Sequence, residues 1–132
     1  FGLARGTYAA HPDDGFTLVE CRVTNAARCV PPANRPLPAE LAACRPFLAS
    51  EIAAMPALRG LLALGRHAHD QSLSALNLRR AAYPFAHGAL HALPNGIVLV
   101  DSYHCSRYNT NTGRLTPAMF RDAVGRLVAA AR

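Results

Sequence analysis

The sequence predicts an α/β protein, a three-layer α/β/α sandwich around a mostly parallel, four-stranded sheet. Four short segments are rich in apolar and β-branched residues, and the expected element order is β-α-β-α-β-β-α. Hydrophobic residues make up 51% of the chain and charged residues 17%, a composition that excludes disorder. The length of 132 residues fits one domain, residues 1–132.

The first half of the chain contains one expected strand and one expected helix. Residues 1–15 are interpreted as a helix end that runs into a loop, and residues 16–25 as a strand. Four prolines within residues 29–38 predict a stiff, extended loop. A helix should follow Pro38 and kink at Pro46. Its apolar residues recur on one face, at Leu41, Cys44, Leu48 and Ile52.

The second half supplies the remaining strands and helices. The apolar run 58–64, closed by Gly65, predicts a buried parallel strand, and residues 66–77 predict a helix. Residues 85–93 and 97–103 predict two strands joined by a Pro-Asn-Gly turn. Thr116 and Pro117 are typical of a helix start, and the helix that follows carries an apolar stripe of Phe120, Val124, Leu127, Val128 and Ala131.

The net charge of the chain indicates which class of molecule it can bind. There are 14 basic residues against 8 acidic ones, a net charge of +6, which suits a polyanion such as nucleic acid; a mildly basic, arginine-rich surface is the alternative. Every basic residue is arginine, so this chain offers no P-loop lysine and no Schiff-base lysine. The chain contains neither a secretory signal nor an apolar run of ~20 residues, so we expect a cytoplasmic protein with no membrane partner.

Two polar segments lie just past the ends of expected strands, where α/β proteins place their sites. Thr24 and Asn25 follow Val23, and a run rich in Ser, Thr, Asn and Arg extends from Ser102 to Arg114. Such side chains can donate hydrogen bonds to phosphates. A capped surface turn before the last helix is the alternative interpretation of the second segment.

These segments resemble motifs of the uracil-DNA glycosylase superfamily, in particular its iron–sulfur type b branch, also called family 5. Residues 23–36, VTNAARCVPPANRP, resemble the strand and proline loop of that branch. Residues 44–48 and 64–66 resemble its second segment. Residues 102–116, SYHCSRYNTNTGRLT, resemble its longest and most specific motif. The resemblance implies a uracil-DNA glycosylase-like fold and an enzyme of base excision repair.

The resemblance also implies a role for each matching residue. Asn25 would read the edge of a flipped uracil with its amide, and His104 would hydrogen-bond a uracil carbonyl oxygen that gains charge as the glycosidic bond breaks. Ser106 and Asn109 would hold flanking phosphates. The remaining DNA-binding residues would be Arg107 and Tyr108 at the gap left in the base stack, and Arg114 as a phosphate contact or loop brace.

The cysteines bear on a cofactor. The branch binds a [4Fe–4S] cluster through four thiolates, and Cys29 and Cys44 match its second pair of ligands. Neither the first pair nor the first active-site loop of the family, with its acidic water-organising residue, occurs here. We therefore expect residues 1–132 to be the C-terminal part of a longer enzyme. Cys105 stands where the family has proline, which loosens the turn beside Ser106.

The expected function is hydrolytic release of uracil, with other deaminated bases as candidate substrates, by a monomeric enzyme that leaves the DNA backbone intact. The alternative is a non-catalytic nucleic-acid-binding remnant of the same fold. A zinc site at His87 and His91 is a weaker hypothesis, because nothing in the sequence supplies two further ligands.

Overall fold

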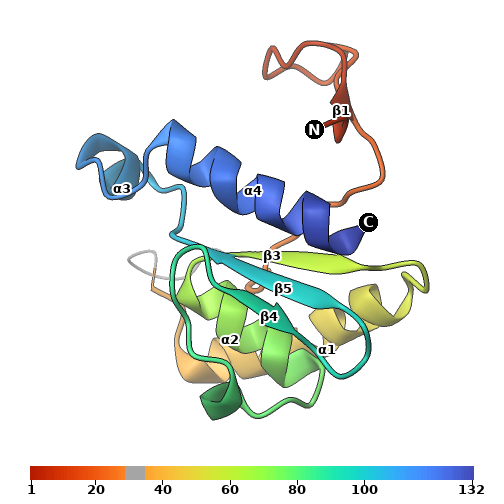
Figure 1. Ribbon diagram of the computed structural model, residues 1–132, viewed down its shortest axis with the longest axis vertical. Helices are drawn as coiled ribbons and strands as arrows, with labels where there is room; N and C mark the ends of the chain where they lie inside the picture. The colour runs from red at the N-terminus through yellow and green to blue at the C-terminus, as the bar shows by residue number, and fades with distance from the viewer. Residues whose placement is uncertain (29–34) are drawn as a thin grey trace.

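The computed structural model describes residues 1–28 and 35–132, and it has three layers (Figure 1). Helix α4 (Pro117–Ala131) packs on one face of the central sheet. Helix α2 (Arg66–Ala75) packs on the other face, and α1 (Pro38–Ala53) packs against α2. The predicted α/β sandwich is therefore confirmed.

The described central sheet has three strands rather than the predicted four. These are β3 (Gly60–Leu64), β5 (Val98–Ser102) and β4 (Leu90–Ala92), in the order β3-β5-β4. The β3–β5 pair is parallel and places Leu64 opposite Ser102, whereas β4 runs antiparallel to β5. All three were predicted as longer segments, and the first part of 85–93 is irregular chain held along β5 by the Gly88 N–H to the Asp101 carbonyl oxygen.

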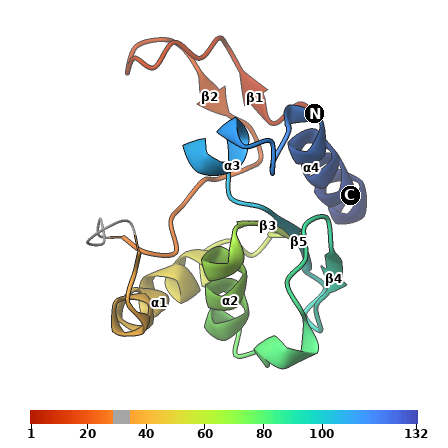
Figure 2. The ribbon, with the colours of Figure 1, turned by 90° about the vertical axis from the view of Figure 1, so that its left-hand side faces the viewer.

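The predicted strand 16–25 is wrong over most of its length. Only β2 (Thr17–Leu18) is extended in a ladder, and it pairs with β1 (Ala4–Arg5) in a separate ribbon, apart from the central sheet in Figure 2. Glu20 has a φ of 54°, which breaks the extended run, and Val23 is 75% exposed. The segment has β-forming residues, but among residues 1–28 and 35–132 no strand pairs with residues 21–25. Residues 1–15 likewise contain β1 instead of a helix end.

The helices follow the sequence pattern closely. Helix α1 continues through Pro46 and buries Leu41 and Leu48 of its predicted stripe. The Thr116 side chain caps α4 by accepting the Met119 N–H at 3.2 Å, as predicted. Two short elements were not predicted, a 3-10 helix η2 (Arg80–Ala82) and α3 (Arg107–Asn111).

The core lies between the sheet and α2, and its buried residues include Ala63, Leu73, Leu93, Ile97 and Leu99. On the other face, Gly60 lets α4 approach β3 closely, because a Cβ at that position would lie 2.5 Å from Leu127 Cδ1. Within the described ranges, no helix is long and apolar enough to span a membrane.

Candidate active site

The main candidate site is a cavity of about 570 Å³ at the carboxyl ends of β3 and β5. The two strands are parallel and end opposite each other, so the chain that leaves each of them meets at one edge of the sheet. The cavity is lined by Gly65, Arg66, Phe85, Ala86, His87, Tyr103, His104 and Arg114. Ligand cavities of single small molecules have about this size.

Gly65 and His104 lie next to each other at this edge of the sheet, and both line the cavity. The Gly65 N–H donates to the Ser102 carbonyl oxygen at 2.8 Å, which extends the parallel ladder by one step. Gly65 has φ 94° and ψ 168°, a conformation that only glycine adopts freely. A Cβ on Gly65 would lie 3.2 Å from the His104 Cβ. Glycine is therefore needed here twice, for the turn into α2 and for space beside the histidine.

The polar loop after β5 holds His104 by its backbone. The Asn109 side-chain amide donates to the His104 carbonyl oxygen at 2.8 Å. Ser106 begins α3, and its hydroxyl accepts the Asn109 N–H at 3.2 Å. Both side chains predicted to hold phosphates thus brace the loop in this structure, and their phosphate role stays a prediction. His104 itself is exposed, and within the described ranges no side chain hydrogen-bonds its ring.

One wall of the cavity is a stack of three side chains. The His87 and Tyr103 rings lie 4.8 Å apart at 26°, and the Tyr103 N–H donates to His87 Nδ1 at 3.0 Å. The Arg114 guanidinium lies over the Tyr103 ring, 4.6 Å from its centroid. This contact joins the end of the polar loop to its start, and the DNA-binding role of Arg114 stays a prediction. Phe85 adds an aromatic contact, with its ring 6.5 Å from that of Tyr103.

The rim of the cavity is positively charged. Arg66 opens α2, whose N-terminal dipole also favours an anion. Arg107 and Tyr108 lie on α3, and Tyr108 is 73% exposed. The arginines that line the cavity, Arg66 and Arg114, suit a nucleic-acid backbone, and an exposed tyrosine such as Tyr108 suits an unstacked base step.

Asn25 lies apart from the cavity, on the exposed segment that leads to α1. This segment is fixed by Arg28, which forms an ion pair with Glu51 and places its guanidinium 5.5 Å from the Phe47 ring centroid. The Arg28 N–H also donates to Cys44 Sγ at 3.4 Å. The hydrogen bond from Arg28, and a second from Thr24, lower the pKa of Glu51 below its ordinary value. Asn25 is not among the described residues that line the cavity.

Comparison with known proteins identifies the chain. A family model described as "Uracil DNA glycosylase superfamily" matches residues 2–128. The chain belongs to the uracil DNA glycosylase superfamily. The resemblance read from the sequence motifs is thereby confirmed, and the cavity at the carboxyl ends of β3 and β5 is a feature of a glycosylase-superfamily fold.

Several relatives are named Type-5 uracil-DNA glycosylase. The protein of Thermus thermophilus is 45% identical over 113 residues, 86% of this chain and 52% of the relative. The protein of Mycobacterium leprae is 39% identical over 128 residues, 92% of this chain and 56% of the relative. The protein of Pyrobaculum aerophilum is 35% identical over 128 residues, covering 97% and 55%. The chain thus spans about half the length of these glycosylases.

One cysteine of this superfamily member has a contact that bears on a cluster site. Cys44 is half-buried on α1, and its sulfur accepts the N–H of Arg28 at 3.4 Å. Hydrogen bonds to sulfur of this kind are typical of cluster thiolates. Cys29 lies outside the described residues. Cys21 instead contacts the Leu3 carbonyl oxygen at 3.3 Å, and Cys105 is exposed in the polar loop after β5.

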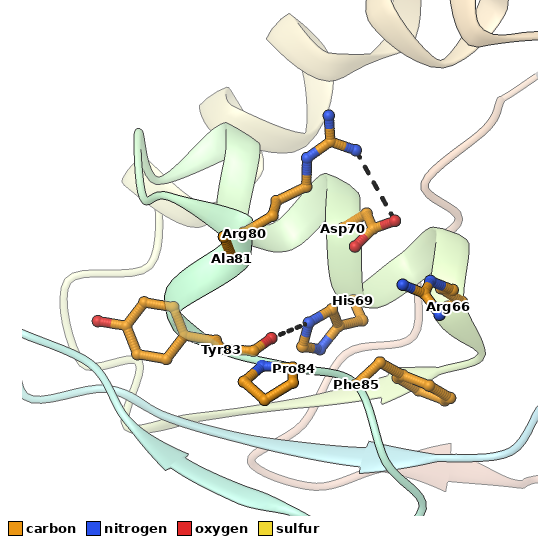
Figure 3. A pocket seen from close by; sticks show the side chains of 8 residues that line it. All are labelled: Arg66, His69, Asp70, Arg80, Ala81, Tyr83, Pro84 and Phe85. Carbon is orange, nitrogen blue, oxygen red and sulfur yellow. Dashed lines mark hydrogen bonds and ion pairs between the residues drawn. The ribbon is translucent and has the colours of Figure 1, made fainter.

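A second cavity of about 310 Å³ adjoins the first, and the two share Arg66 and Phe85 (Figure 3). His69 lines this second cavity and belongs to a group that sequence reasoning missed, together with the half-buried His91 and the buried Asp101. His69 faces Asp101 and the Tyr83 carbonyl oxygen, and His91 also bonds Asp101. The hypothesis of a zinc site at His87 and His91 is not supported for His87, because His87 lies outside this group and its Nδ1 accepts the Tyr103 backbone N–H.

Other glycosylase-site features were also missed. Gly65, Phe85 and the Tyr103 stack were not singled out as site residues, although Gly65 directly after a buried strand was a usable signal. No local pattern joins Arg28 to α1, because its partners Cys44, Phe47 and Glu51 share a face only once that helix has formed.

Proposed function

We propose that this chain forms the base-releasing part of a uracil-DNA glycosylase. The observation that carries the proposal is the placement of His104 in a cavity of about 570 Å³, large enough to admit a base, at the carboxyl ends of two parallel strands, with Arg66 and the α2 N-terminus at its edge. The enzyme flips uracil out of the duplex into this cavity, because a stacked base is out of reach.

The reaction is hydrolysis of the N-glycosidic bond. The bond between C1′ and the base nitrogen breaks, its electron pair stays with uracil, and a water oxygen bonds to C1′ while its proton passes to solvent. The charge spreads to the carbonyl oxygens of the departing base. His104 donates a hydrogen bond to one of them and so stabilises the transition state more than the substrate.

The other predicted residues take roles around this step. Asn25 reads the edge of the base once DNA is bound, and Ser106 and Asn109 contact the flanking phosphates. Arg107, Tyr108 and Arg114 line the path of the DNA strand, with Arg114 also bracing Tyr103. We extend the proposal to other deaminated bases such as hypoxanthine, and to a monomeric enzyme that acts on DNA in the cytoplasm.

A [4Fe–4S] cluster is part of the proposal. Cys29 and Cys44 supply two of its four thiolates, and the cluster fixes the chain between them rather than supplying reaction chemistry. The chain contains no lysine for Schiff-base chemistry, so base release leaves an abasic site with an intact backbone. Strand cleavage by the pure protein without heat or alkali would contradict this part.

The test is His104→Ala in the complete natural protein. We expect the excision rate on uracil-containing DNA to fall about 10²–10³-fold, since one transition-state donor is lost, while DNA affinity changes little. His67→Ala is the matched control, because His67 is an exposed histidine on α2 that lines neither cavity.

A non-catalytic nucleic-acid-binding protein is the second candidate, favoured by one observation. Cys105 stands exposed between His104 and Ser106, where the resembled motif has proline. If the unaltered protein releases no base and His104→Ala only weakens DNA binding, the second candidate replaces the first.

A further inference from the structure

Three ionisable side chains lie together beside the wall of the candidate active site, two of them buried and the third, His91, half-buried. His69 is 1% exposed and Asp101 is fully buried. His69 Nδ1 lies 2.6 Å from Asp101 Oδ1, and His91 Nε2 lies 3.0 Å from Asp101 Oδ2. The proposed reaction uses none of these side chains, so their burial needs another explanation.

The hydrogen-bond partners of the two ring nitrogens determine the charge of His69. Its Nε2 lies 2.8 Å from the Tyr83 carbonyl oxygen, which can only accept, so Nε2 carries a proton (Figure 3). If His69 were neutral, a bare Nδ1 lone pair would then face the Asp101 carboxylate at 2.6 Å. Two acceptors do not approach this closely, so a second proton lies between Nδ1 and Oδ1.

The remaining contacts decide which partner holds that proton. The Ala86 N–H donates to Asp101 Oδ2 at 3.4 Å, and His91 Nε2, 3.0 Å from the same oxygen, can donate to it as well. Hydrogen bonds donated to Oδ2 favour the ionised carboxylate over the acid. His69 is then an imidazolium, and its bond to Asp101 is short because both partners are charged.

A metal ion would need different spacing. Zinc keeps nitrogen and oxygen ligands at about 2.0–2.2 Å, so two ligands of a tetrahedral zinc lie roughly 3.3 Å apart. The His69 and Asp101 atoms are only 2.6 Å apart, which fits a shared proton and not a zinc ion between them.

Both members of the ion pair contact the chain segment that lines the proposed base-binding cavity. Asp101 holds the Ala86 N–H by its side chain and the Gly88 N–H by its backbone carbonyl, at 2.8 Å in the second case. The His69 ring packs edge-on to Phe85, with centroids 5.5 Å apart. Phe85, Ala86 and His87 form one wall of the cavity that contains His104. The ion pair therefore ties this wall to β5, the strand that leads into His104.

We propose that the buried His69–Asp101 ion pair positions the base-binding wall against His104, so that both are positioning residues for base release. The proposal rests on the proposed glycosylase function. Because the pair contacts the cavity wall and no rim arginine, its loss should lower kcat and leave KM for DNA nearly unchanged.

Two measurements on the complete natural protein test it. In the unaltered protein, ¹⁵N NMR should report protons on both His69 nitrogens at neutral pH. Asp101→Asn should leave only Nε2 protonated, because the new amide can donate to a neutral Nδ1 while its oxygen still accepts from His91 and Ala86. A single proton on His69 in the unaltered protein, or stoichiometric Co²⁺ binding that Asp101→Asn abolishes, would overturn the ion pair.

The excision assay tests the positioning role. We expect His69→Gln to lower kcat at least about tenfold with KM within about twofold, since small displacements in a site cost such factors. His67→Gln, an exposed change on the same helix, should alter neither constant. An unchanged kcat in folded His69→Gln protein would refute the positioning role. If the unaltered protein releases no uracil, the proposed function fails, whereas the NMR result still decides the ion pair.

Discussion

Adding one methyl group at Gly65 should harm both stability and base release, for separate reasons. In Gly65→Ala the backbone must keep φ 94° and ψ 168°, a conformation that costs a residue with a side chain about 1–3 kcal/mol. The new Cβ would also lie 3.2 Å from the His104 Cβ, which must move by a few tenths of an ångström. Displacements of about 1 Å cost roughly 10²-fold in rate, so we expect about a tenfold loss of excision.

Gly96→Ala is the matched control. Gly96 lies in the turn before β5 with φ 81°, and a Cβ there would have no neighbour within 4 Å. It should cost about 1–2 kcal/mol in stability without changing excision. Chemical denaturation measures the first effect and single-turnover excision measures the second. The reasoning is refuted if Gly65→Ala protein, once shown to be folded, releases uracil as fast as the Gly96→Ala variant.

Three further changes test other contacts. Asn109→Ala removes the bond to the His104 carbonyl oxygen, worth about 0.5–1.5 kcal/mol, and should slow single-turnover excision at saturating enzyme up to about tenfold, while its proposed phosphate contact predicts a weaker DNA affinity as well. The pKa of Glu51 is lowered mainly by Arg28, so the stabilisation is complete above the ordinary value of 4.5 and is lost as the pH falls through the lowered value. Hydrogen-exchange protection of residues 24–28 should therefore fall on acidification, and Arg28→Ala should already lack it at neutral pH; equal protection in both proteins would contradict the contact. Gly60→Val should push α4 from β3 and destabilise the protein by about 1–3 kcal/mol in urea unfolding, with excision unchanged in the folded fraction.

The sequence predicts those parts of the fold that depend on local pattern. The apolar runs 58–64 and 97–103 contain β3 and β5 because a strand covered on both faces needs apolar residues throughout. Helix α4 was placed correctly because its cap and its first proline are adjacent in the chain. The prediction of a strand over residues 16–25 was wrong because a strand also needs a neighbouring strand to pair with. The β propensity of a segment does not show whether such a strand is present.

Some residues of the candidate site can likewise be recognised from the local sequence, whereas others come together only in the folded structure. The polar run after β5 that contains His104, Ser106 and Asn109 is visible in the sequence because it is continuous, whereas the roles of the three residues come from the family resemblance and stay predictions. The His69–Asp101–His91 group was missed because its members come from a helix and two strands, and only the folded sheet brings them together. His69 occupies an ordinary helical position, so nothing in its local sequence distinguishes it from the exposed His67.

The parallel pairing of β3 with β5 also has a consequence for the order of folding. The β4–β5 hairpin closes through a short turn, whereas β3 can reach β5 only after the long crossover through α2 has been ordered. Non-local pairing of this kind forms slowly. The backbone hydrogen bond from Gly65 to Ser102 is therefore among the last features to form. The position of His104, which follows β5 at the same edge, is fixed equally late. In refolding from denaturant, helix and hairpin signals should recover before catalytic competence does.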